Sequence, residues 1–365
     1  MRVGVPKEIK NHEYRVGLTP PSVSELVAAG HDLIIQAGAG SGIDFSDADY
    51  VTAGARIVGT AAEVFAEADM IVKVKEPQPV EIAMLEPRHV LFTYLHLAPD
   101  PEQAAGLMKS GATCIAYETV TARDGSLPLL KPMSEVAGRM SIQVGAHYLE
   151  KEQGGRGVLL GGVPGVAPAK VAILGGGVSG VNAAQMAVGM RADVTIYDIS
   201  NQRLAELDMF FSSQIKTAYA SKAAIAAAVA NAHLVIGAVL VPGAAAPKLV
   251  TRDMLKTMKR GSVLVDIAID QGGCFETSHA TTHDDPVFTV DGIIHYCVAN
   301  MPGAVARTSA FALNNATLPF ALRLANLGAE AAMQADPHLA AGLNVSGGKI
   351  RHRAVAEALG LPFEG

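Results

Sequence analysis

Four polar side chains in this sequence have the types and positions that chemistry on a small carboxylate would use. Arg15 lies in a polar loop after the first expected strand, and a guanidinium can hold a carboxylate through two hydrogen bonds. Lys75 and Asp270 end expected strands, and His96 follows one; histidine is the side chain best suited to exchange protons near neutral pH. Each residue taken singly also has an ordinary explanation: a solvated arginine, a packed histidine or an aspartate that caps a turn. Alternation places Lys73 on the same face as Lys75, so one of these lysines can simply point into solvent.

Residues 171–180 contain an apolar strand followed by a glycine-rich turn. The strand Val171–Leu174 leads into Gly175-Gly176-Gly177-Val178-Ser179-Gly180, a G-x-G-x-x-G sequence, and a helical pattern follows. In dinucleotide-binding proteins the first glycine permits the tight turn, the second lets the backbone approach the pyrophosphate, and the third lets helix and strand pack closely. These roles fall here on Gly175, Gly177 and Gly180. The N–H groups at the start of the helix, around Val178 and Ser179, then face the phosphates.

An acidic residue ends the next expected strand. Asp198 follows Val194–Tyr197 and lies 18 positions beyond the last glycine. A carboxylate at this place hydrogen-bonds the ribose 2′-hydroxyl of NAD and repels the 2′-phosphate of NADP. Arg203 lies nearby and either weakens that preference or is a solvated cation on a helix face. A glycine-rich turn alone is weak evidence, but together with the flanking strand, helix and acid it predicts an NAD-binding site.

Further candidates for cofactor contact follow from the expected topology. Ligands of open parallel sheets bind beyond the carboxyl ends of the strands. The residues that end or follow expected strands there are Val239, Leu240, Ile267, Asp270, Val298, Asn300 and Met301.

The elements that must position these residues alternate along most of the chain. Short β-branched runs separated by helical patterns predict parallel sheets with helices on their faces. The expected strands are 2–5, 32–36, 70–75, 89–94 and 113–118 in the first third, then 171–174, 192–198, 234–240, 262–270 and 293–298. Ser134 follows a segment rich in Pro and Gly, and we expect it to cap a helix that runs to about Gln153. After residue 305 the pattern is helical, most clearly over 314–327 and 353–359.

The helix-led change near residue 134 and the helical tail predict a split arrangement of two domains. Residues 1–128 together with 306–365 are expected to form a discontinuous substrate and catalytic domain. Residues 129–305 are expected to form an inserted, Rossmann-type NAD-binding domain.

Composition excludes several other classes of function. Half of the 365 residues are hydrophobic, 18% are charged and the formal net charge is −6, an ordinary globular balance. No block of Lys and Arg points to a nucleic-acid partner. The most apolar stretch, 223–246, is rich in alanine and contains Asn231, His233 and Pro242, so we expect no membrane span. Cys114, Cys274 and Cys297 are widely spaced. We therefore expect neither disulfides nor a metal site, and a reducing cytoplasm is the simplest location.

Seven ordered segments carry a family resemblance. They are Gly4–Asn11 with Glu13 and Arg15-Val16, then Val72–Pro77, Phe92–Leu97, Gly157–Val166, Gly237–Gly243, Asp270–Cys274 and Asn300–Ala304. On these segments the chain resembles the alanine dehydrogenases from end to end. Two positions depart from the family pattern: Ala220, where members often carry a serine that here stands next door as Ser221, and Arg307, where an aromatic residue is common.

The resemblance implies an α/β fold of two Rossmann-like, doubly wound domains with a cleft between them, in a cytoplasmic homohexamer. It implies the reversible conversion of L-alanine, NAD⁺ and water to pyruvate, ammonium and NADH. By the family pattern Arg15 holds the substrate carboxylate, Lys75 contacts its carboxylate or carbonyl oxygen, and His96 and Asp270 are the acid–base pair. Ser134, Asp198, Arg203 and the strand-end residues named above line the NAD site, and no metal is involved.

Three other functions remain open at this point. The chain also resembles the NAD(H)-binding component of a proton-translocating transhydrogenase and, less closely, saccharopine dehydrogenase. A catalytically inactive NAD-binding regulator is the third. The combination of Arg15, Lys75, His96 and Asp270 with no expected membrane segment favours alanine dehydrogenase over all three.

Overall fold

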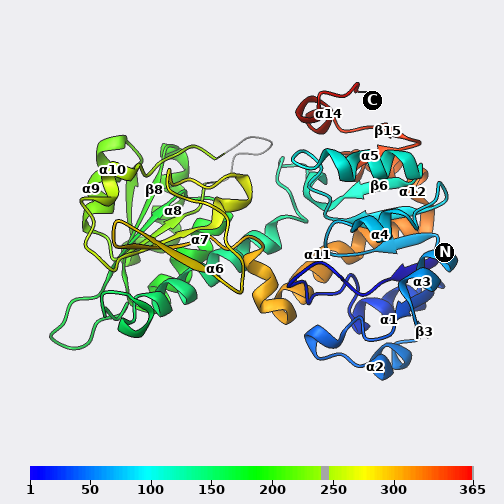
Figure 1. The fold of residues 1–365 in the computed structure, drawn as a ribbon, viewed down its shortest axis with the longest axis horizontal. Coiled ribbons are helices and arrows are strands. Elements are labelled where there is room, and N and C mark those ends of the chain that lie inside the picture. Colours follow the sequence, from blue (N-terminus) through cyan, green and yellow to red (C-terminus); the bar gives the residue numbers. More distant parts are fainter. Residues whose placement is uncertain (240–245, 364–365) are drawn as a thin grey trace. The chain divides into compact units, whose positions relative to one another are not determined.

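The computed structural model describes residues 1–239 and 246–363 and divides into two compact units (Figure 1). Unit 1 comprises Met1–Met133 and Val305–Gly365, and unit 2 comprises Ser134–Ala304. Unit 1 is discontinuous in sequence because the whole of unit 2 is inserted between its two segments. The expected limits, after residues 128 and 305, differ from these by five residues and one residue.

The sheet of unit 1 has eight strands within the described residues, in the order β15-β14-β6-β5-β4-β1-β2-β3. They are β1 (Arg2–Val5), β2 (Asp32–Gln36), β3 (Arg56–Val58), β4 (Met70–Val72), β5 (Val90–Thr93), β6 (Thr113–Ala116), β14 (Leu343–Ser346) and β15 (Lys349–Ile350). From β3 to β6 all neighbours are parallel, and the order 3-2-1-4-5-6 is that of a doubly wound dinucleotide-binding sheet. The C-terminal strand β14 pairs antiparallel with β6, and β15 pairs with β14; Figure 1 shows the red β15 above the cyan β6.

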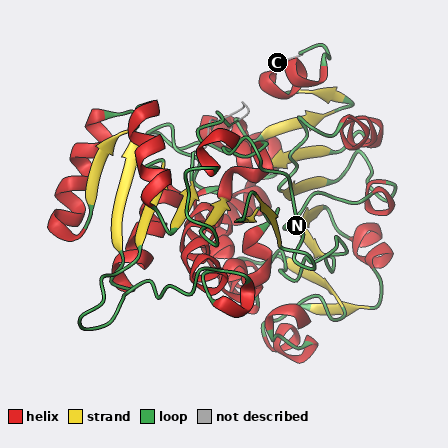
Figure 2. Cartoon of the chain, turned by 60° about the vertical axis from the view of Figure 1, so that its left-hand side comes forward, coloured by secondary structure: helices red, strands yellow, loops and turns green. Residues whose placement is uncertain are grey.

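Helices flank this sheet (Figure 2). They are α1 (Pro20–Ala28), α2 (Asp47–Thr52), α3 (Ala61–Glu67), α4 (Pro79–Ile82), α5 (Pro101–Ser110), α11 (Ala306–Leu327), α12 (Ala329–Ala335), α13 (Pro337–Ala340) and α14 (Arg353–Leu359). Capping boxes at Ser46 and Thr60 begin α2 and α3, and the Asp100 carboxylate caps α5. Because both faces are covered, the central strand β4 is apolar and buried at each of its three residues.

Unit 2 repeats the same strand order. Its sheet has seven strands within the described residues, in the order β12-β13-β11-β10-β7-β8-β9. They are β7 (Lys170–Leu174), β8 (Asp193–Asp198), β9 (Lys216–Tyr219), β10 (Leu234–Gly237), β11 (Val263–Asp266), β12 (Val287–Val290) and β13 (Ile293–Tyr296). Only β12, at one edge, is antiparallel among these strands, and the order from β9 to β13 is again 3-2-1-4-5-6. The α/β class with two Rossmann-like units is therefore confirmed.

The helices of unit 2 are α6 (Lys131–Tyr148, whose first three residues belong to unit 1), α7 (Val178–Gly189), α8 (Asn201–Phe211), α9 (Lys222–Asn231) and α10 (Arg252–Leu255). Helices α6 and α7 pack closely, since a Cβ on Gly138 would lie 2.2 Å from the Ser179 carbonyl oxygen. Across the residues that the structure describes, no helix is long and apolar enough to cross a membrane.

Several expected elements have different limits in the structure. The strands expected over 70–75 and 262–270 are too long, because β4 ends at Val72 and β11 ends at Asp266. The Asp266 carboxylate accepts the N–H of Ala268 at 3.1 Å, which starts a 3₁₀ turn instead of continuing the strand. The strand expected over 234–240 ends at Gly237, and its last residue, Leu240, lies outside the described residues.

The expectation that Ser134 caps a helix is wrong. Helix α6 begins at Lys131, whose N–H donates to the Leu127 carbonyl at 3.0 Å, so the helix continues a preceding turn and Ser134 lies inside it. It ends at Tyr148, before a separate 3₁₀ turn over Lys151–Gln153. Helix α11 begins at Ala306, where the helical pattern expected after residue 305 starts, and ends at Leu327, as expected.

Candidate active site

The glycine-rich turn between β7 and α7 shows why each of its key glycines is needed. Gly175 has a φ of +104°, a conformation that side chains disfavour. A Cβ on Gly180 would lie 1.9 Å from the Gly175 carbonyl oxygen, so only glycine lets α7 approach β7. A Cβ on Gly177 would meet nothing within 4 Å, so the backbone there is open to a ligand. Beyond it, the exposed Val178 and half-buried Ser179 begin a helix of 12 residues, whose N–H groups favour an anion.

Asp198 ends β8 beside this turn. Its Oδ2 accepts the N–H of Gly176 at 2.8 Å, and its Oδ1 accepts the N–H of Ser200 at 2.8 Å. Arg203, in the first turn of α8, donates its Nε–H to the Gly176 carbonyl at 2.7 Å. The carboxylate and the guanidinium therefore hold the two polar backbone groups of one turn residue. Ser221, next to Ala220, caps α9 by accepting the N–H of Ala224 at 3.1 Å.

Asp270 lies on a 3₁₀ turn that a buried neighbour organises. The turn spans Ile267–Gln271, and Asp270 is exposed on it. The Asp266 carboxylate accepts hydrogen bonds from Ser278 Oγ at 2.5 Å and from the N–H of Cys274 at 2.9 Å. Burial raises the pKa of Asp266, and these hydrogen bonds oppose the rise. Asp266 thus ties both ends of the segment that carries Asp270 to the carboxyl end of β11.

The remaining expected cofactor residues of unit 2 lie at the same edge of the sheet or beside it. Val239 follows β10, Ile267 follows β11 and Val298 follows β13. Asn300 has a φ of +60°, and the buried Met301 begins a 3₁₀ turn. Ser134 lies one helical turn before Gly138, the residue of α6 that packs against the start of α7.

Arg15 lies in the loop between β1 and α1 of unit 1 and is buried, with 2% of its surface exposed. Its Nε and Nη2 atoms donate to the two carboxylate oxygens of Glu13 at 2.7 and 2.5 Å. Its Nη1 lies 3.0 Å from the Met133 sulfur. Burial opposes the charge of Arg15, but Glu13 raises its pKa, so the pair is a fixed cation and anion.

Lys75 follows β4 in a bend, half-buried, and its backbone is held from two sides. The Lys75 carbonyl accepts from Thr93 Oγ1 at 2.9 Å, and Glu8 Oε1 accepts the N–H of Val74 at 2.6 Å. Lys73 does not point into solvent: it is fully buried.

Lys73 forms the centre of a buried ion cluster. Its Nζ donates to Glu8 Oε2 at 2.9 Å and to Glu81 Oε1 at 2.8 Å. Burial opposes the charge of Lys73, but the two carboxylates raise its pKa. Burial also raises the pKa of Glu8, and Lys73 limits that rise. The cluster joins the loop after β1 to the bend that carries Lys75.

His96 follows β5 in a left-handed backbone conformation, with φ of +48°. Its ring stacks on Tyr94, with centroids 5.7 Å apart and planes 6° from parallel. Glu118 Oε1 accepts the His96 N–H at 2.6 Å and lies 4.0 Å from its Nδ1. The ring is 44% exposed. Arg15, Lys75 and His96 therefore follow β1, β4 and β5, three adjacent parallel strands, at their shared carboxyl edge.

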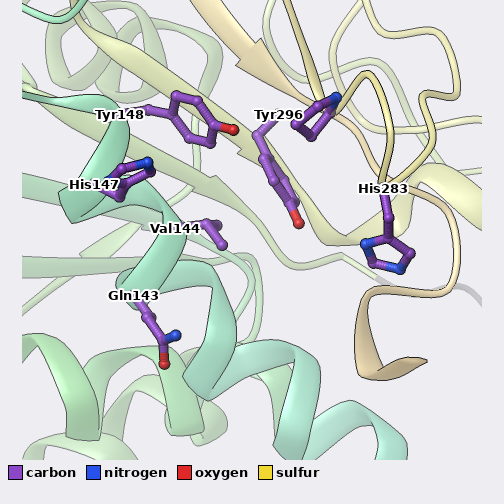
Figure 3. A pocket seen from close by; sticks show the side chains of 7 residues that line it. Gln143, Val144, His147, Tyr148, His283 and Tyr296 are labelled. Carbon is purple, nitrogen blue, oxygen red and sulfur yellow. The ribbon is translucent and has the colours of Figure 1, made fainter. Parts of the chain in front are cut away.

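A separate cavity of about 220 Å³ lies in unit 2 between α6, the 283–286 segment and β13 (Figure 3). Its lining comprises Gln143, Val144, His147, Tyr148, His283, Pro286 and Tyr296. Tyr148 and Tyr296 lie with ring centroids 5.8 Å apart, and His283 Nε2 lies 3.2 Å from the Asn300 carbonyl oxygen. This cavity contains none of the expected site residues.

Sequence reasoning did not find the residues that hold the expected site in place. They are Glu8, Glu13, Lys73, Glu118 and Asp266, all buried or mostly buried acidic or basic groups. Glu8, Glu13 and Lys73 stood in recognised segments without an assigned role, and Glu118 and Asp266 stood outside them. One sequence feature could have indicated these residues: a charged residue inside or beside a strand that is otherwise apolar, as at Lys73 and Asp266.

The chain has two doubly wound units. One has a dinucleotide-binding turn, and the other has Arg, Lys and His at the carboxyl edge of its sheet. This combination defines the class of two-domain, dinucleotide-dependent dehydrogenases. The family is more specific. The model described as alanine dehydrogenase/PNT, N-terminal domain, matches residues 4–137, and that of the C-terminal domain matches residues 141–353. The chain belongs to the alanine dehydrogenase/PNT family, which confirms the resemblance seen in the sequence.

Individual relatives agree with the family match over the whole chain. The chain is 61% identical to an alanine dehydrogenase of Halomonas elongata, covering 100% of this chain and 98% of the relative. It is 55% identical to the alanine dehydrogenase of Bacillus subtilis, over 100% and 96%. A solved L-alanine dehydrogenase superposes with a TM-score of 0.96 at 54% identity, covering 99% of each chain. A transhydrogenase from Sinorhizobium meliloti superposes with a TM-score of 0.83 at 28% identity, over 97% of this chain and 100% of that one.

Proposed function

We propose that this chain is an NAD-dependent alanine dehydrogenase, which converts L-alanine, NAD⁺ and water to pyruvate, ammonium, NADH and a proton, reversibly. The observation that carries the proposal is the set Arg15, Lys75 and His96 at one carboxyl edge, in a chain matched end to end by relatives named alanine dehydrogenase. Deamination of a small amino acid requires cations that hold its carboxylate, here Arg15 and Lys75, and a group that exchanges protons with water, here the exposed imidazole of His96.

The residues of unit 2 fit NAD. The open backbone at Gly177 accommodates a pyrophosphate, and the Asp198 carboxylate at the end of β8 suits the ribose hydroxyls. Val178, Ser179 and Gly180 supply the helix start, and the remaining contacts are Ser134, Arg203, Val239, Leu240, Ile267, Asp270, Val298, Asn300 and Met301. NAD supplies the acceptor for the hydride of the substrate Cα.

Unit 1 supplies the groups that hold the substrate and the group that deprotonates the attacking water. Arg15 and Lys75 bind the substrate carboxylate and carbonyl oxygen, and Glu13 and Glu8 fix their positions. His96 takes a proton from the water that attacks the iminium carbon. Asp270, which belongs to unit 2, assists the transfers that release ammonia. The stacked Tyr94 ring and Glu118 keep the His96 imidazole in one orientation.

We further propose a cytoplasmic homohexamer, as the family resemblance implies. Two features support assembly and location. The loop residues Leu159, Val163 and Val166 expose 65%, 54% and 62% of their surface, and contact with other copies would cover them. The three cysteines are buried and form no disulfide with one another, as suits a reducing compartment. Light scattering on the purified protein tests the assembly, and a mass of one chain would contradict it.

The second candidate is an NAD(H)-binding transhydrogenase component, which the superposition on the Sinorhizobium meliloti structure favours. One assay separates the two. With NADH, pyruvate and ammonium, we expect the absorbance of the reduced nicotinamide to fall only when both substrates are present. A fall that is independent of pyruvate, or no fall at all in protein that binds NADH, would contradict alanine dehydrogenase activity.

A further inference from the structure

The NAD-binding turn holds a cation where NADP-binding proteins use one. In doubly wound domains an arginine near the acidic residue accommodates the 2′-phosphate of NADP. Arg203 occupies such a place, because its Nε donates to the Gly176 carbonyl while Asp198 accepts the N–H of the same glycine. Asp198 and Arg203 therefore both bind the backbone of the same turn residue, Gly176.

The packing of α8 fixes Arg203 in this place. A Cβ on Gly176 would lie 2.7 Å from Leu207 Cδ1 and 3.4 Å from Arg203 Cγ. The missing side chain of Gly176 lets α8 lie directly against the turn. Leu207 is 2% exposed, so this contact belongs to the core of unit 2.

A second carboxylate occupies the outer side of the guanidinium. Glu206 Oε2 lies 2.7 Å from Arg203 Nη1, and Glu206 Oε1 accepts from Gln202 Nε2 at 3.3 Å. The guanidinium thus donates to the Gly176 carbonyl through Nε and to Glu206 through Nη1. A phosphate at the 2′ position would have to compete with Glu206 for this cation and would meet its negative charge.

We propose that Glu206 is a specificity-determining residue, which acts through Arg203 to exclude the 2′-phosphate of NADP. The inference rests on the proposed NAD site and goes beyond it. Asp198 faces the ribose. Glu206 neutralises the Arg203 guanidinium, which would otherwise attract the 2′-phosphate of NADP. Selectivity for NAD therefore depends on two carboxylates, one at the end of β8 and one on the first turn and a half of α8.

The size of the effect follows from the exposure of the pair. Arg203 and Glu206 expose 36% and 49% of their side chains, and exposed ion pairs of this kind alter equilibria by about 1.5- to 5-fold. We therefore expect Glu206→Gln to tighten NADPH binding by about 2- to 5-fold and to leave NADH binding nearly unchanged.

Equilibrium binding of NADH and NADPH, followed by nicotinamide fluorescence without substrate, tests the proposal. The matched control is Asp208→Asn, which removes the same charge from an exposed position of the same helix. The double variant Glu206→Gln/Arg203→Gln removes the cation as well. We expect the gain in NADPH affinity in Glu206→Gln alone, and its loss in the double variant.

Two results would overturn the proposal: an equal gain in Asp208→Asn, which would make it an effect of net charge, or a gain that persists without Arg203. Failure of the wild-type protein to bind NADH would instead refute the proposed cofactor site, and this inference with it.

Discussion

Glu118 holds His96 in a backbone conformation that residues other than glycine rarely adopt. The carboxylate accepts the His96 N–H at 2.6 Å while the residue has a φ of +48°. Such strain persists where surrounding groups enforce it, and it collects at functional sites. The placement of His96 therefore depends on a residue 22 positions later in the sequence, after the next strand, β6.

The first prediction concerns this pair. His96→Ala should retain NADH binding and lower kcat by about 10²–10⁴-fold, because the proton acceptor is gone. Glu118→Ala should lower kcat by about 10–100-fold through misplacement of the ring, with a smaller change in pyruvate KM. Glu118→Gln keeps one acceptor oxygen and should recover most of the loss. Equal activity in all three variants and wild type, by steady-state assay, would rule out the role of His96.

The second prediction contrasts two glycines of the NAD turn. Gly180→Ala should destabilise unit 2, since its Cβ would collide with the Gly175 carbonyl. Gly177→Ala should leave the melting temperature nearly unchanged, because its Cβ meets no protein atom, yet weaken NADH binding by filling the approach. Gly189→Ala, at an exposed position of α7 where a Cβ meets nothing within 4 Å outside its own helix, is the control: it should leave NADH affinity unchanged and should not lower the melting temperature, because alanine favours a helix more than glycine does. NADH titration and thermal unfolding measure the two effects, and unaltered affinity in Gly177→Ala would contradict the proposed pyrophosphate site.

The third prediction concerns the buried ion cluster. Lys73→Met leaves Glu8 and Glu81 facing each other without a cation, so the free energy of unfolding should fall by about 3–5 kcal/mol. Arg56→Met breaks the exposed pair with Glu67 and should cost less than about 1 kcal/mol. Denaturant titration of both variants measures the difference. If both variants lose a similar, small amount of free energy of unfolding, the buried ion cluster does not stabilise the bend that carries Lys75.

The fourth prediction is a pH dependence of stability. Burial lowers the pKa of His295 to about 4, and the nearby His279 contributes in the same direction. The folded state therefore resists a proton that the unfolded state binds below about pH 6.5. This contribution to stability is complete above that pH and is lost as the pH falls toward 4, at about 1.4 kcal/mol per pH unit. His295→Gln should flatten this part of the profile, whereas His147→Gln, on an exposed ring, should not; parallel profiles for His295→Gln and wild type would refute the assignment.

Sequence patterns predicted the two sheets well because their central strands are buried on both faces. Strands 2–5 and 32–36 were expected with the limits that β1 and β2 have. The short strands β3, β9, β12, β14 and β15 were missed, since each is at or near a sheet edge and carries little apolar pattern.

The site was harder to predict than the fold. The residues Arg15, Lys75 and His96 are marked by motifs, but their supports depend on tertiary contacts between distant loops, such as Glu8 with Val74. The limits of β11 were missed because a side chain, Asp266, ends the strand by binding the backbone beyond it. Arg307, one of the two departures from the family pattern, also depends on tertiary contacts: its guanidinium lies over the rings of Phe45 and Phe311, which no local sequence pattern indicates.

The pairing of β14 with β6 constrains how the chain is made. Strand β6 ends at Ala116, but its partner begins at Leu343, after the whole of unit 2 has been synthesised. At ribosomal rates of about 5–20 residues per second, β6 remains an open sheet edge for roughly 10–45 s. Unit 2 is contiguous and can close its sheet in that interval. The part of the protein that leaves the ribosome first is therefore the last to be completed, and it is the part that a chaperone would have to shield.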